Sequence, residues 1–160
     1  MVEMKLTGMD GVLNLLQSLP PELVSKRGGP VKSALRKAAL VIQKQAKANL
    51  QAATHNATEE QSYSTGLLLQ NLIVSRGKAP SSGKGERYLV RVRRKGYVRK
   101  GKPVSTLKTA QLLEYGSSQQ PAEPWIRPAF NAKATEAIRT AETELLKNLD
   151  RIVKKLAKGK

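Results

Sequence analysis

The sequence predicts an α+β fold in which a small antiparallel sheet of three to four strands, one pair forming a basic hairpin, packs against two long helices. Two stretches, 30–50 and 128–157, carry apolar residues every three or four positions, which is typical of amphipathic helices. From Arg87 to Arg94 apolar and basic residues alternate, which indicates a strand. With 160 residues we expect a single domain, 1–160, whose longest helix is at the C-terminus.

The composition limits the function classes. Only 39% of residues are hydrophobic and 4% aromatic, so the core is expected to be aliphatic and rich in alanine. The chain has no cysteine, which excludes disulfides, thiolate metal sites and a cysteine nucleophile. We expect no secretory signal, because the first residues lack an apolar stretch, and no membrane span, because no apolar run approaches 18 residues.

The charge is strongly basic, with 29 Lys and Arg against 12 Asp and Glu and a net charge of +17. A field of this strength favours a polyanionic neighbour: nucleic acid, an acidic protein surface or anionic lipid. The alternative is that the charge only keeps the fold soluble. We favour a polyanion because the basic residues are clustered rather than spread.

The first half of the chain is predicted to hold two helices and a short strand. Residues 2–7 form the strand, residues 10–19 the first helix, and residues 20–29 a connection. Pro30 begins the second helix, which runs to about Leu50. Its buried stripe comprises Val31, Leu35, Ala38, Ile42 and Ala46. Its basic residues lack acidic partners within the helix and are expected to be solvated or to face a partner: Lys32, Arg36, Lys37, Lys44 and Lys47.

The middle of the chain is predicted to be less regular. Residues 51–64 form a polar loop in which His55, the sole histidine, is exposed and binds no metal. Residues 67–76 form a strand, with or without a preceding helical turn, and residues 77–85 form a connector of Gly, Ser and Pro. For residues 104–114 the pattern does not decide between a strand and a short helix.

The strand over 87–94 has two different faces. Tyr88, Val90 and Val92 are expected to face the helices, while Leu89 and the arginines between them face outward. A flexible basic loop follows at 94–103, with only Tyr97 at its tip, so we expect no aromatic platform and no sequence-specific reading of nucleic acid. The candidate surface toward a polyanion, a DNA channel or an acidic partner is Arg87, Arg91, Arg93, Arg94, Lys95, Arg99, Lys100 and Lys102.

The stretch 112–130 contains the only Trp, the only Phe and three of the eight prolines. Gly116 is suited to a positive φ, and Pro128 fits the first turn of the following helix. The prolines make this elbow (residues 112–130) stiff, as in a binding or assembly arm rather than a moving enzyme loop. We expect its residues to form a subunit or core interface: Tyr115, Gly116, Pro124, Trp125, Ile126, Arg127, Pro128 and Phe130.

The last helix, from Pro128 to about Ala157, is predicted to exceed roughly 40 Å at 1.5 Å per residue. Because that is more than a domain of this size covers, part of its stripe is expected to pack on another subunit. The stripe comprises Phe130, Ala134, Ala137, Ile138, Ala141, Leu145, Leu149, Ile152, Val153 and Leu156.

No motif of catalysis is present in the sequence. The segment GKGER lacks the spacing of a phosphate-binding loop, and the adjacent Glu59 and Glu60 seldom converge on one site. The remaining acids are scattered along helices. We therefore expect no catalytic residue, no metal and no cofactor, and predict that the protein is not an enzyme.

The elbow sequence LEYGSSQQPAEPWIRPAF resembles the signature of the HK97 gp10-like family of tailed-phage tail-completion or head–tail joining proteins. The N-terminal TGMDGVLNLLQSL and Thr65-Gly66-Leu67 resemble the same family. Where that family more often has basic and hydroxylic residues, this chain has Leu68, Gln70 and Asn71.

The resemblance implies a structural virion protein of a bacteriophage, located at the neck or tail top and made in the host cytoplasm. It implies a homo-oligomeric, hexameric ring that joins tail to head and contacts a connector or stopper, a tail terminator or a tail tube. Double-stranded DNA in the channel is a further implied partner, and no membrane is. A non-specific nucleic-acid-binding protein and the tail terminator itself are the alternatives. The sequence leaves ring size, phage and host open.

Overall fold

The computed structural model describes residues 14, 29–55, 66–78 and 85–158. The predicted strand 2–7 lies outside these residues, as do nearly all of the predicted helix 10–19 and most of the connections 20–29 and 77–85.

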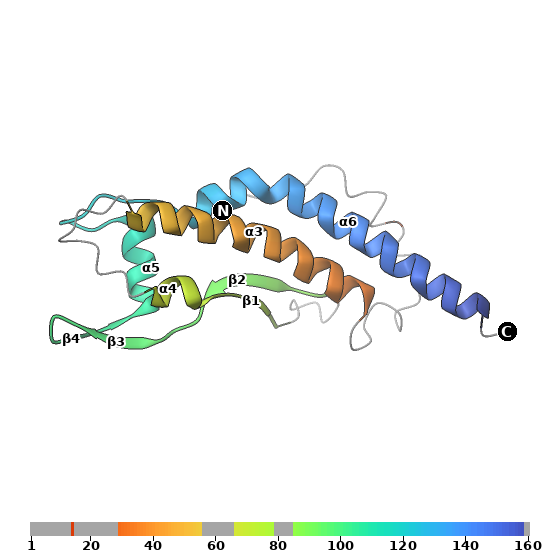
Figure 1. The fold of residues 1–160 in the computed structure, drawn as a ribbon, viewed down its shortest axis with the longest axis horizontal. Coiled ribbons are helices and arrows are strands. Elements are labelled where there is room, and N and C mark those ends of the chain that lie inside the picture. The colour runs from red at the N-terminus through yellow and green to blue at the C-terminus, as the bar shows by residue number, and fades with distance from the viewer. Residues whose placement is uncertain (1–13, 15–28, 56–65, 79–84, 159–160) are drawn as a thin grey trace.

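Two long antiparallel helices form the spine of the molecule (Figure 1). Helix α3 spans Pro30–His55, with 26 residues, and α6 spans Ile126–Lys158, with 33 residues. At 1.5 Å per residue, α6 is about 50 Å long and α3 about 39 Å. The C-terminal end of α6 consequently extends beyond the start of α3 (Figure 1).

A two-stranded sheet packs on the side of α3 that faces away from α6 (Figure 1). The short helix α4 (Leu67–Gln70) leads into β1 (Leu72–Arg76), which pairs antiparallel with β2 (Tyr88–Val92). The helical turn before the strand is therefore present. The Gln43 side chain on α3 donates a 2.7 Å hydrogen bond to the Leu72 carbonyl, which ties the sheet to the helix.

A second two-stranded sheet is the hairpin of β3 (Gly96–Arg99) and β4 (Lys102–Ser105). Its turn consists of Lys100 (φ 48°) and Gly101 (φ 75°), and positive φ at both turn residues suits the twist of a hairpin. The loop predicted at 94–103 is thus largely paired strand. Helix α5 (Thr106–Tyr115) follows β4 directly, so residues 104–114 hold the end of a strand and then a helix.

The predicted α+β class is confirmed, with four strands arranged as two sheets rather than one. The reason lies at Thr106, which is fully buried. Its hydroxyl donates to the Arg93 carbonyl (2.8 Å) and accepts from the Lys95 backbone N–H (2.9 Å). This clasp holds residues 93–95 against the start of α5, so the hairpin cannot extend the β1–β2 ladder.

The core is aliphatic and rich in alanine, as predicted. Of the twelve buried hydrophobic residues among those described, seven are alanines. Small side chains are needed because α3 is packed on one side by α6 and on another by the strands. The largest fully buried hydrophobic side chains are Trp125, Leu50 and Leu72.

Two expectations for the helices were wrong. Helix α3 continues through His55, where a loop was predicted, because QAATH contains no helix breaker. Phe130, on the predicted stripe of α6, is 37% exposed because Trp125 and Ala129 occupy the core at that end of the helix, and its expected packing on another subunit stays a prediction. Two lysines predicted to be solvated or partner-facing bind acids from other elements: Lys32 lies 3.4 Å from Glu86 and Lys37 lies 2.6 Å from Glu144.

Candidate functional site

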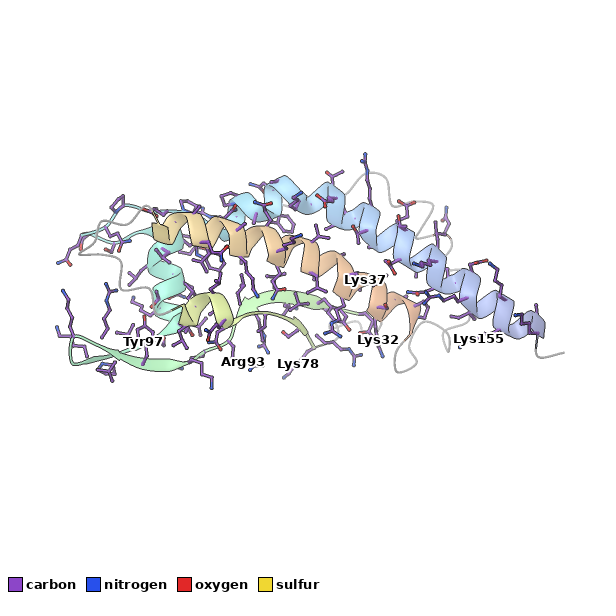
Figure 2. All side chains as sticks on the ribbon, in the orientation of Figure 1. Lys32, Lys37, Lys78, Arg93, Tyr97 and Lys155 are labelled. Atoms are coloured by element: carbon purple, nitrogen blue, oxygen red, sulfur yellow. The ribbon has the colours of Figure 1, made fainter. Side chains whose placement is uncertain are left out.

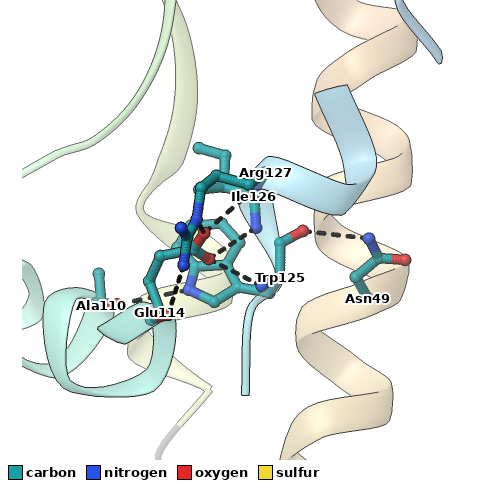
Figure 3. A network of polar contacts seen from close by, with 6 residues as sticks. All are labelled: Asn49, Ala110, Glu114, Trp125, Ile126 and Arg127. Atoms are coloured by element: carbon teal, nitrogen blue, oxygen red, sulfur yellow. Dashed lines mark hydrogen bonds and ion pairs between the residues drawn. The ribbon is translucent and has the colours of Figure 1, made fainter. Parts of the chain in front are cut away.

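The elbow is anchored in the core by Trp125, which is 1% exposed. Its indole packs with Leu50, Leu72 and alanines of α3, α5 and α6. The indole Nε1 donates to the Ala110 carbonyl on α5 (3.4 Å), and the Asn49 amide on α3 donates to the Trp125 carbonyl (3.0 Å; Figure 3). The elbow is therefore attached to two helices at once, and Trp125 lies in the core, one of the two locations predicted for it.

A buried carboxylate, Glu114 at the end of α5, closes the start of α6 (Figure 3). One oxygen, Oε2, accepts the backbone N–H groups of Trp125 (2.8 Å) and Ile126 (3.0 Å). The other, Oε1, accepts the Arg127 N–H (3.3 Å) and its guanidinium Nε (2.6 Å). Negative charge here is favourable because the first N–H groups of a helix lack partners within the helix.

The environment of Glu114 sets its protonation. Burial alone would raise the pKa of this carboxyl group. The Ile126 N–H, the Arg127 guanidinium and the N–H groups of Trp125 and Arg127 together outweigh that effect and lower the pKa below its usual range. Glu114 is thus held as a carboxylate and caps α6, a helix that begins twelve residues further along the chain.

Glu114 was not among the residues predicted for this site. It is the only acid between Glu86 and Glu123, and it lies two residues before Gly116. A single acid in so basic a stretch, beside a turn, was the available signal. Its partners, however, are backbone groups on another element, and no local pattern reveals those.

Gly116 has the positive φ that the sequence predicted, with φ 77°. A Cβ at this position would lie 2.8 Å from the Ala122 nitrogen, closer than such atoms come in proteins. The close approach arises because the chain doubles back here: the Glu123 N–H donates to the Leu113 carbonyl (2.8 Å). Glycine is required at this position for space as well as for backbone angle.

The other elbow residues divide between the core boundary and the surface. Ile126 is half-buried against the core. Tyr115 is 69% exposed, and Pro124, Pro128 and Phe130 are also exposed. The Arg127 guanidinium carbon lies 5.0 Å from the centre of the Tyr115 ring, a cation–π arrangement. The elbow thus holds its exposed aromatic and proline side chains on a backbone that Trp125 and Glu114 keep in place.

The basic surface extends along β2 and onto the hairpin. Figure 2 shows Arg93 on the side of the strand layer away from α6, with Tyr97 further along on β3. Leu89, predicted to face outward with the arginines, is half-buried. All eight basic residues predicted for this surface are exposed: Arg87, Arg91, Arg93, Arg94, Lys95, Arg99, Lys100 and Lys102.

The nearest acid does not offset this surface. The Glu86 carboxylate accepts two hydrogen bonds from Arg76, at 2.7 and 2.8 Å, and lies 3.4 Å from Lys32. The hydrogen bond from Arg76 is the main reason that the pKa of Glu86 is lowered. Glu86 therefore pairs with two cations that lie outside this surface, and the eight basic side chains are exposed to solvent.

Within the described ranges, no three His, Asp or Glu side chains lie close enough together to hold a metal ion. Among the same residues, no helix has both the length and the apolar character needed to cross a membrane. No protein-family model matches the chain, and no curated protein and no solved structure gives a significant match.

Proposed function

We propose that this chain is a structural protein of a tailed-phage virion. In this proposal it is a tail-completion or neck protein that forms a hexameric ring at the head–tail junction and helps to join tail to head. The observation that carries the proposal is the elbow: its sequence resembles the signature of such proteins, and its geometry is that of a rigid, surface-presenting element.

The elbow is suited to subunit contact in residue type and in stiffness. Exposed Tyr115, Phe130 and Arg127 belong to the residue types that are enriched in protein interfaces. Trp125 and Glu114 hold the backbone beneath them, so little conformational freedom is lost when a partner binds. In a ring these side chains would contact the neighbouring subunit or an adjacent neck protein.

The basic surface of β2 and the hairpin would then face DNA in the channel or an acidic neighbour. Its contacts with DNA would be made to phosphates rather than to bases, since Lys and Arg at exposed positions neutralise the backbone without reading sequence. Such a surface tolerates DNA that moves past it.

The direct test is electron microscopy of particles made when this gene is disrupted in a phage that carries it. Filled heads with separate tails of normal length are the expected result. Tails of abnormal length would assign the terminator role instead. Intact infectious particles would contradict a virion function.

The exposed basic surface also favours a second candidate, a non-specific nucleic-acid-binding protein. Purified protein would then bind duplex DNA of any sequence, with an affinity that falls steeply with salt. A plot of the logarithm of the binding constant against the logarithm of salt concentration would have a slope of roughly −0.9 for each phosphate neutralised. Tight, salt-dependent binding together with intact infectious particles would select this candidate over the first.

A further inference from the structure

Two stripes of opposite charge run along α3 and α6, each centred on an exposed leucine. On α3, the basic stripe consists of Arg36, Leu40 and Lys44, spaced four residues apart and all exposed, with Leu40 41% exposed. On α6, the acidic stripe consists of Glu142, Leu146 and Asp150 at the same spacing; Glu142 is half-buried, Asp150 is exposed and Leu146 is 49% exposed. Residues four apart lie on one face of a helix, about 6 Å apart along its axis.

Neither stripe is used within the part of the chain that the structure describes. There, Arg36, Lys44 and Glu142 form no salt bridge. Asp150 pairs with Lys154 on its own helix at 2.7 Å, but both side chains are more than half exposed. A pair so exposed contributes little and is easily exchanged for another.

The two stripes lie on opposite sides of the helix pair. The Lys37–Glu144 salt bridge, 2.6 Å long, marks one side of the seam between α3 and α6, and Figure 2 labels Lys37 there. Leu40 is three residues beyond Lys37, so it lies about 60° away around α3 and on the same side. Leu146 is two residues beyond Glu144, about 200° around α6, and so lies on the other side.

We propose that the basic stripe on α3 of one copy of this chain binds the acidic stripe on α6 of a second copy. Two cations flank one leucine and two anions flank the other at matching spacing, so charge and apolar contact coincide. Equal four-residue rows of two helices can pack as ridges into grooves. Arg139 lies one turn before Glu142 on α6. Because Arg139 is positively charged and would repel the basic stripe, we expect it at the edge of the contact, next to acidic groups, and not at its centre.

Because the stripes are on opposite sides, the contact joins different surfaces and leaves one of each free at the ends of a dimer. Repeating such a contact closes into a ring when the rotation permits it. The ring rests on the proposed function, whereas the contact itself is a property of the purified chain and can be measured without a phage.

The experiment uses two variants of the full chain, studied by sedimentation at about 0.15 M salt, where the Debye length is about 8 Å. Arg36→Glu/Lys44→Glu makes both stripes acidic, and Glu142→Lys/Asp150→Lys makes both basic. The wild type is expected to assemble and each variant alone to stay monomeric. An equal mixture of the two variants is expected to assemble again, because each acidic stripe then meets a basic one.

Matched controls separate the contact from net charge. Lys78→Glu/Lys108→Glu lowers the net charge by four, as the first variant does, and Gln111→Lys/Thr135→Lys/Glu136→Lys raises it by four, as the second does. These positions are exposed and lie outside the elbow, the basic surface and both stripes. Both controls are expected to assemble like the wild type. Circular dichroism checks that every variant keeps its helices.

Three results would overturn the proposal: a monomeric wild type, variants that assemble alone, or folded variants whose mixture stays monomeric. None of these results would alter the appearance of particles in the gene-disruption experiment. Conversely, infectious particles after gene disruption would contradict the virion function. Assembly of the mixed variants would still support the contact between two copies of the chain, whose biological role would then be open.

Discussion

The elbow and the hairpin β3–β4 contain similar kinds of residue, but the elbow is anchored in the core whereas the hairpin lies on the surface. Each contains a glycine with positive φ, a proline, an aromatic residue and an arginine. In the elbow Trp125 is 1% exposed, whereas in the hairpin Val98 is 73% exposed. The elbow has an internal acid, Glu114, for its backbone N–H groups and its arginine, while the hairpin sequence contains no acid. The acid of the elbow binds backbone N–H groups and an arginine beside the core, whereas the basic side chains of the hairpin lie exposed on the surface.

The largest expected effect is at Trp125. Replacing it by alanine removes the biggest side chain of the core, and such changes typically cost about 3–5 kcal/mol in the free energy of unfolding. Val98→Ala in the hairpin serves as the contrast and is expected to stay within about 0.5 kcal/mol. Urea unfolding followed by circular dichroism measures both. A Trp125→Ala loss no larger than that of Val98→Ala would remove the basis of the comparison.

Glu114→Gln keeps the size of the side chain and removes its charge. Hydrogen bonds to charged groups are worth about 1.5–3 kcal/mol each, and one amide oxygen cannot replace two carboxylate oxygens. We therefore expect a loss of about 2–3 kcal/mol in the same assay. Glu136→Gln, at an exposed acid on α6, is the matched control and should change little. Equal losses in the two variants would show that Glu114 does not cap α6.

The same carboxylate predicts a pH dependence. The folded-state pKa of Glu114 is lowered from its ordinary value of 4.5, so its contribution is fully present above pH 4.5 and is lost as pH falls through the folded-state pKa. Unfolding free energy should decrease in that acidic range. The pKa values of Glu86 and Glu144 are also lowered, so these groups also lose stabilising interactions as the pH falls. Glu114→Gln should therefore reduce the acid-induced decrease in unfolding free energy without abolishing it. A variant with the wild-type pH profile would contradict this.

The two glycines sharpen the comparison further. Gly116→Ala and Gly101→Ala both place an L-residue at positive φ, near 77° and 75°. At Gly101 nothing lies within 4 Å of the added Cβ, so the cost should be the backbone term alone, about 1–2 kcal/mol. At Gly116 the Ala122 nitrogen must also move, which adds strain of about 1–3 kcal/mol. In thermal unfolding, Gly116→Ala should therefore be less stable than Gly101→Ala. The reverse order would be inconsistent with a tightly packed elbow.

The smallest effect on stability is expected for the basic surface. Neutralising Arg91, Arg93, Arg99 and Lys100 as glutamines should change unfolding free energy by no more than about 0.5 kcal/mol. The logarithmic salt slope of duplex DNA binding should fall by up to about 3.6, at 0.9 per phosphate contact. Four glutamines at Lys147, Lys154, Lys155 and Lys158 on α6 provide a control of equal charge. Loss of folded protein in the first variant would give those residues a structural role instead.

Local patterns in the sequence determined much of this protein. The periodicity of 30–50 and 128–157 indicated both long helices, the alternation at 87–94 indicated β2, and the proline and glycine pattern indicated a rigid elbow with positive φ at Gly116. These features depend on residues within one or two turns of each other, where steric limits and hydrophobic periodicity act directly. The sequence placed Trp125 at a core or subunit interface, and the tertiary structure shows that it lies in the core.

Only the tertiary structure decided which distant groups meet. Glu114 caps α6 because α5 ends beside it, Thr106 separates the two sheets because it reaches back to 93–95, and Lys37 finds Glu144 because α3 and α6 are antiparallel. The same packing left Leu40, Leu146, Tyr115 and Phe130 on the surface, although their spacing alone would also suit a core. Such pairings join residues up to more than a hundred positions apart, and side-chain burial depends on the partner face that each helix meets, which no local pattern encodes.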